Sequence, residues 1–100
     1  MAAKHYAPRA RVMLVSHGGF AVPAGQRAAA IVSSPDARAA AAACDPLLVL
    51  PDDPIGYARE LYAALHTADA ANVDVIVIET PPLADPAWRA VADRLARAAR

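Results

Sequence analysis

Four short segments of the chain are rich in apolar, often β-branched residues. They span residues 12–16, 30–33, 47–50 and 73–79. The last is nearly continuous in apolar residues, broken only by Asp74, as expected of a strand covered on both faces. Short apolar runs that alternate with longer helical stretches are typical of a parallel α/β sheet. The pattern therefore predicts four parallel strands.

Three helix starts share one device, a capping side chain placed directly before a proline. The pairs are Ser34-Pro35, Asp53-Pro54 and Asp85-Pro86. The side-chain oxygen can accept a free amide proton of the first turn, and proline loses nothing at the first helical position. We therefore predict that a helix begins at each pair.

Helical periodicity predicts which faces are buried. After Asp53 the apolar stripe is Ala58, Leu61, Tyr62, Leu65 and Ala68. After Asp85 it is Trp88, Val91, Ala92, Leu95 and Ala99. The alanine-rich segment 34–44 has no clear stripe, and we predict a helix of small side chains packed close to the sheet.

The segment from His17 to Ala29 is the weakest part of the pattern. It must join two strands in about a dozen residues, near the minimum for a parallel crossover. Its glycines indicate a loop with at most a short helix. The chain as a whole predicts a β-α-β-α-β-α-β-α order. This is a small Rossmann-like, three-layer α/β domain over residues 11–100, with about four parallel strands and helices on both faces. The strand order stays open, because several right-handed arrangements satisfy the pattern.

Composition narrows the class of protein without identifying it. One hundred residues allow one domain, and 28 of the 57 apolar residues are alanine. The formal net charge of zero gives no field that favours nucleic acid or an anionic membrane. No apolar run is long enough to span a membrane, and the N-terminus lacks a signal-peptide core. The single cysteine, Cys44, excludes an internal disulfide. We expect a cytoplasmic protein that binds neither membrane nor nucleic acid directly.

Candidate ligand-binding residues gather at two predicted strand ends, where an α/β sheet presents its ligand crevice. They are Ser16, His17, Gly18 and Gly19 after the first strand, and Glu79 at the end of the last. Amides of a Gly-Gly turn can face a phosphate. The pattern is nevertheless neither G-x-G-x-x-G nor a P-loop, and a plain turn is the favoured interpretation. Glu79 could equally cap a neighbouring helix or pair with Arg94, and we favour a structural role.

Other chemistry finds little support in the sequence. His5, His17 and His66 have no metal-ligand spacing, so we expect no metal and no cofactor. Cys44 lacks a basic neighbour and is predicted to be a buried thiol. No catalytic residue is assigned.

The first ten residues form a separate segment ahead of the first strand. Lys4, His5 and Tyr6 are followed by Pro8, which biases Ala7 toward extended backbone. The segment is either a frayed terminus or a short recognition arm, with Tyr6 as its anchor.

The arm and the C-terminal half resemble a known family. Lys4 to Pro8, running into Arg11 to Val15, is similar to the K-Y-x-H-Y-[AS]-P linker that enters the C-terminal domain of two-domain threonylcarbamoyl-AMP synthases. The segments 57–65, 73–76 and 79–82, with Asp69 between the first two, resemble that domain's helix-strand unit. Residues 93–99 resemble its closing N-D-R-L-x-x-A-A helix. Residues 17–54 show no such match.

The resemblance implies an accessory role in making the threonylcarbamoyladenosine of certain tRNAs. In that family the N-terminal domain joins L-threonine, bicarbonate and ATP, and the linker folds over its pocket. Carried over by position, Lys4, His5, Tyr6 and Pro8 would form this strap. Residues 1–100 include no counterpart of the catalytic domain, so the resemblance implies docking on a separate catalytic domain.

Two other interpretations remain open. The chain could be an independent small-ligand or nucleotide-binding module that uses the strand-end cluster. It could also be a homo-oligomer that associates through exposed faces carrying Trp88 or Tyr57.

Overall fold

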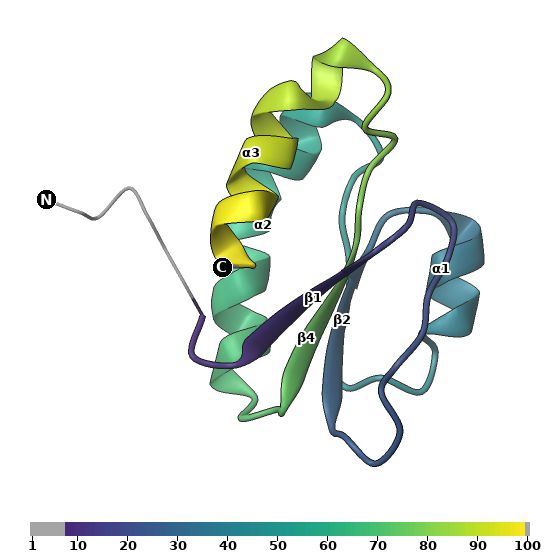
Figure 1. Ribbon diagram of the computed structural model, residues 1–100, viewed down its shortest axis with the longest axis vertical. Helices are drawn as coiled ribbons and strands as arrows, with labels where there is room; N and C mark the ends of the chain where they lie inside the picture. The colour runs from purple at the N-terminus through teal and green to yellow at the C-terminus, as the bar shows by residue number, and fades with distance from the viewer. Residues whose placement is uncertain (1–7, 100) are drawn as a thin grey trace, which may run out of the picture.

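A computed structural model describes residues 8–99, which form one four-stranded parallel sheet with helices on both faces (Figure 1). The elements follow the chain in this order: β1 (Arg11–Val15), β2 (Ala28–Val32), α1 (Pro35–Ala40), β3 (Leu47–Val49), α2 (Pro54–Ala70), β4 (Val75–Glu79), a 3-10 turn η2 (Pro86–Trp88) and α3 (Arg89–Ala98). The α/β class and the parallel sheet are confirmed.

The strand order is β1-β4-β2-β3, so the last strand is inserted between the first two. Arg11 to Val15 pair with Val75 to Glu79, and Ala28 to Ile31 pair with Val75 to Ile78. Every residue of β2 and β4 is buried, as expected of central strands covered on both faces. The carboxyl ends of β1, β4 and β2 therefore lie level with one another.

The three capped helix starts are confirmed, the third as the 3-10 turn η2 that leads into α3. The side chains of Ser34, Asp53 and Asp85 each accept a hydrogen bond from a backbone amide of the turn that follows. The helix predicted over 34–44 is shorter than expected, because α1 ends at Ala40 and turns carry the chain on to Cys44. The predicted element order placed a helix between the first two strands, and this prediction was wrong. A loop joins β1 to β2 on the side of α1 (Figure 1).

The larger part of the core lies between the sheet and the pair α2 and α3, which cover one face together (Figure 1). The buried stripe of α2 is Tyr57, Leu61, Ala64, Leu65 and Ala68. The prediction placed Tyr62 in this stripe and was wrong, because Tyr62 is 54% exposed while Tyr57 is fully buried. On α3, Val91 and Leu95 are buried as predicted, with Ala98 as the third position.

Candidate functional site at the carboxyl edge of the sheet

Glu79 is the charged residue at the centre of the sheet edge that is formed by the carboxyl ends of the strands. It ends β4, the strand that lies between β1 and β2, and its side chain is fully buried. A buried carboxylate is costly unless hydrogen bonds replace the water that it loses. The neighbouring strand ends supply those hydrogen bonds.

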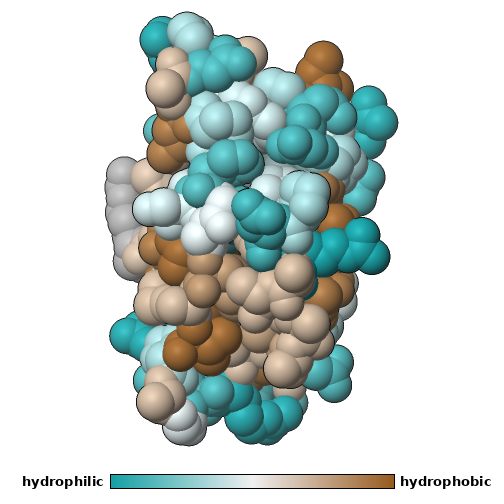
Figure 2. Space-filling model, turned by 90° about the vertical axis from the view of Figure 1, so that its right-hand side faces the viewer, coloured by the Kyte–Doolittle hydropathy of each residue, from teal (hydrophilic) through white to brown (hydrophobic). Residues whose placement is uncertain are grey.

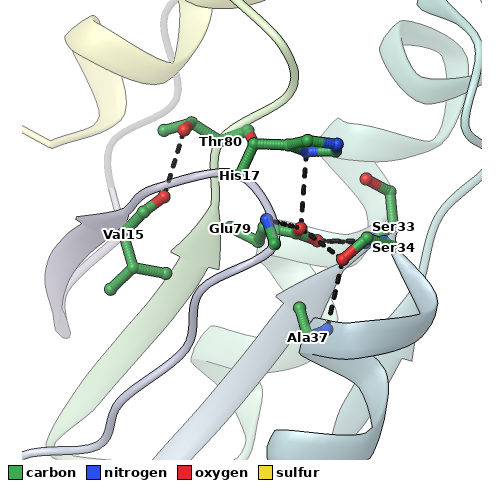
Figure 3. A network of polar contacts seen from close by, with 8 residues as sticks. Val15, His17, Ser33, Ser34, Ala37, Glu79 and Thr80 are labelled. Atoms are coloured by element: carbon green, nitrogen blue, oxygen red, sulfur yellow. Dashed lines mark hydrogen bonds and ion pairs between the residues drawn. The ribbon is translucent and has the colours of Figure 1, made fainter.

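Four hydrogen bonds converge on this carboxylate from two other parts of the chain (Figure 3). The backbone amides of Ser33 and Ser34, which follow β2, donate to Oε1 at 2.8 and 3.0 Å. The hydroxyl of Ser34 donates to Oε2 at 2.5 Å, and the amide of Gly18, after β1, donates at 2.6 Å. One side chain thus joins the ends of three strands.

The hydrogen bonds decide the charge state of Glu79. Burial alone raises the pKa of this carboxyl, but the bonds from the amide of Ser33, the hydroxyl and amide of Ser34, and the amide of Gly18 outweigh it. The net effect is a pKa below the ordinary value, so Glu79 is a carboxylate at neutral pH.

His17 lies across the mouth of this cluster and is partly exposed (Figure 3). Its Nδ1 is 3.1 Å from the carbonyl oxygen of Thr80 and 3.4 Å from Oε2 of Glu79. Because a carbonyl oxygen only accepts, the contact with Thr80 places the proton on Nδ1. In the neutral ring, Nε2 is therefore the atom that is able to accept a hydrogen bond.

The turn after β1 brings only some of its predicted residues to the cluster. The amide of Gly19 bonds to the carbonyl oxygen of Ser16 at 2.9 Å, which closes the turn. Gly18 adopts a φ of 81°, a conformation that glycine accepts and other residues avoid, and this aims its amide at Glu79. Ser16 and Gly19 shape the turn without contacting the carboxylate.

Of the five candidates, the structure brings together His17, Gly18 and Glu79. Glu79 contacts the start of a neighbouring helix through Ser34, whose amide and hydroxyl donate to it, while the side chain of Ser34 itself caps α1. The alternative of an ion pair with Arg94 is not observed among residues 8–99, where the partners of Glu79 are the strand-end groups described above. Ser33 and Ser34 were missed as partners. Their position after a strand was visible in the sequence, but their closeness to Glu79 depends on the strand order.

Beside this cluster, an open pocket of about 460 Å³ lies between α1 and β3. Its lining is mostly apolar and includes Ser33 and Ser34, and among the described residues Arg38 is the only charged one in the lining. Within residues 8–99, Arg38 makes no ion pair. The molecular face that carries α1 is hydrophilic in its upper part, apolar over an area below the middle and hydrophilic again at its lower end (Figure 2).

The exposure of Trp88, Tyr57 and Cys44 tests the roles that the sequence suggested for these residues. Trp88 and Tyr57 are 4% and 0% exposed, and their rings meet edge-on at 5.5 Å in the core. The expectation that these residues form an exposed oligomer face is therefore wrong.

Cys44 is only partly buried, and desolvation raises its pKa, which disfavours the reactive thiolate.

Two further kinds of feature are missing from residues 8–99. No group of three or more metal-ligating side chains occurs there. No helix in that range has both the length and the apolar character needed to cross a membrane.

Arg9 and Ala10, directly ahead of β1, are held at the opposite edge of the sheet. The amides of Arg9 and Ala10 donate to the two carboxylate oxygens of Asp69, near the end of α2, at 3.1 and 3.0 Å. Lys4, His5 and Tyr6 lie outside the described residues, whereas Pro8 directly precedes the anchored pair.

A comparison with protein families identifies the relationship. The family model for the C-terminal domain of threonylcarbamoyl-AMP synthase matches residues 1–100. The chain belongs to this family. The match includes residues 17–54, for which the sequence motifs indicated no resemblance. None of the curated proteins compared with the chain matches it.

Proposed function

We propose that this threonylcarbamoyl-AMP synthase C-terminal domain is a non-catalytic accessory module that docks on a separate catalytic domain and helps to close it. Its place would then be in tRNA threonylcarbamoyladenosine synthesis, in the cytoplasm. The family match along the whole chain carries the proposal. The match gives the family alone, and the accessory role, the docking and the closure are what we propose.

Two features of the structure support an accessory role. The polar residues at the carboxyl edge are engaged with one another, with the carboxylate of Glu79 holding four intramolecular hydrogen bonds. At the other edge, Asp69 fixes the backbone of Arg9 and Ala10. A strap of Lys4, His5, Tyr6 and Pro8 would therefore leave the domain from a defined point.

The test is size-exclusion chromatography with light scattering of the chain, alone and mixed with a purified catalytic domain of threonylcarbamoyl-AMP synthase. We expect a 1:1 complex that tightens when ATP and L-threonine are present. Tyr6→Ala and His5→Ala should weaken it. Leu83→Ala changes an exposed apolar side chain at the opposite edge of the sheet and serves as the matched control. Separate peaks under every condition would refute docking, and equal affinity of all three variants would refute the strap.

A second candidate function is an independent small-ligand or nucleotide-binding module. The pocket between α1 and β3 favours it, because the cationic side chain of Arg38 within a mostly apolar lining suits an anionic ligand with an apolar body. Calorimetry with ATP, AMP and L-threonine tests this function. Heat that disappears in Arg38→Ala would support it, and no heat from the folded protein would count against it.

A further inference from the structure

We infer that the crevice between the carboxyl ends of β2 and β4 is an anion-binding site that the chain fills with its own carboxylate, so that removing the Glu79 side chain would leave a site for a small monocarboxylate. This inference goes beyond the proposed accessory function. It concerns a site for which the family relationship provides no ligand.

The position of Glu79 in the fold is the first argument. The connection that leaves β2 runs to α1 on one face of the sheet, and the connection that leaves the neighbouring β4 runs to α3 on the other (Figure 1). A crevice opens where adjacent parallel strands send their connections to opposite faces, and ligands of open α/β sheets bind there. In this chain the carboxylate of Glu79 occupies that place.

The donors around the carboxylate are the second argument. Three backbone amides and one hydroxyl point at it, with the imidazole of His17 nearby (Figure 3). Successive amides arranged around a concavity form the type of nest that holds anions in proteins. No lysine or arginine of residues 8–99 forms an ion pair with Glu79, so the site recognises its anion mainly through main-chain hydrogen bonds.

The site is also held in place by contacts that do not involve Glu79. The turn that carries Gly18 is closed by the bond from Gly19 to Ser16. Ser34 is fixed by its own capping bond from the amide of Ala37, at 3.1 Å. Because the carboxylate takes no part in these contacts, the donors should keep their positions after its removal and remain able to bind an anion.

The experiment deletes the internal anion and supplies an external one. Glu79→Ala removes the terminal CH₂–COO⁻ of the side chain, and acetate restores nearly the same atoms. For a dissociation constant on the order of 10 mM, 100 mM acetate would raise the melting temperature of Glu79→Ala by roughly 5–10 °C above the same concentration of sodium chloride. The wild type should show no such difference between the two salts.

The matched control is Val77→Ala, which makes a cavity two residues earlier in the same buried strand. It should be destabilised without responding to acetate. Equal responses of both variants would show a general salt effect and overturn the inference, as would no acetate response of Glu79→Ala. If Glu79→Ala is unfolded in buffer, circular dichroism during acetate titration replaces melting. Recovery of structure would then support the inference, and failure to recover it would contradict it.

A measurement on the wild type tests whether the carboxylate of Glu79 already fills the site. Because the site is already filled, millimolar phosphate or acetate at pH 7 should leave the amide resonances of Gly18, Ser33 and Ser34 unshifted. A saturable shift of these three amides would show that the crevice is open to ligands. None of these results depends on whether the chain docks on a catalytic domain.

Discussion

The hydroxyl of Ser34 donates to Oε2 of Glu79 at 2.5 Å and at the same time accepts the amide of Ala37 at 3.1 Å. One buried side chain thus caps α1 and binds the carboxylate at the end of β4. The N-terminus of α1 and the centre of the sheet are therefore stabilised through the same oxygen atom.

The neighbouring serines allow a direct test of this double role. Ser34→Ala removes both bonds and leaves a buried carboxylate with one donor fewer, so we expect a loss of about 1–3 kcal/mol in the free energy of unfolding. Ser33→Ala is the control, because the buried hydroxyl of Ser33 has no partner in residues 8–99. Its effect should stay within about 0.5 kcal/mol in urea unfolding. Equal losses in the two variants would contradict the argument.

The turn after β1 offers a second matched pair. Gly18 has a φ of 81°, so an added Cβ would strain the backbone that presents its amide to Glu79, whereas Gly19 has no positive φ. We expect Gly18→Ala to cost about 1–2 kcal/mol and Gly19→Ala clearly less. Thermal unfolding of both variants measures the difference. A larger loss in Gly19→Ala would show that the turn is held differently.

The lowered pKa of Glu79 predicts how stability depends on pH. Because the folded-state pKa lies below the unfolded-state value, the carboxylate contributes its full stabilisation above the unfolded pKa and loses it as the pH falls through the folded pKa. Glu79→Gln lacks this contribution. The free-energy difference between wild type and Glu79→Gln should therefore be constant above about pH 6 and shrink below about pH 5. A difference that stays constant down to about pH 3 would contradict an ionised Glu79.

Several features of the fold followed from local patterns, and others depended on pairing between distant segments. The four strands and the three Xaa-Pro helix starts could be predicted because each depends on neighbouring residues only. The insertion of β4 between β1 and β2 could not, because parallel strands of this kind look alike in sequence. The partners of Glu79 follow from that insertion. The buried face of α2 was misassigned between Tyr57 and Tyr62, since apolar character alone does not distinguish two tyrosines.

Because Tyr57 is a core residue, its replacement should change the stability of the domain. Its ring is fully buried against Trp88, and its hydroxyl has no hydrogen-bond partner in residues 8–99. Burial, and secondly the negative charge of Glu79, raise its pKa. Tyr57→Phe removes an unsatisfied polar group and should be neutral or slightly stabilising. Tyr57→Ala leaves a cavity and should cost about 3–5 kcal/mol in chemical unfolding. A marked loss in Tyr57→Phe would indicate that the hydroxyl has a partner after all.

Asp69 holds the backbone directly ahead of β1, because its carboxylate accepts the amides of both Arg9 and Ala10. Asp69→Ala should cost about 1–2 kcal/mol and speed hydrogen exchange at these two amides. Asp93→Ala is the control, since Asp93 forms an exposed pair with Arg97 that is worth at most about 0.5 kcal/mol. If the strap closes a catalytic domain, Asp69→Ala should also weaken that complex more than Asp93→Ala does, because the strap would no longer start from a fixed point. Unchanged exchange at Arg9 and Ala10 would show that other contacts hold this segment.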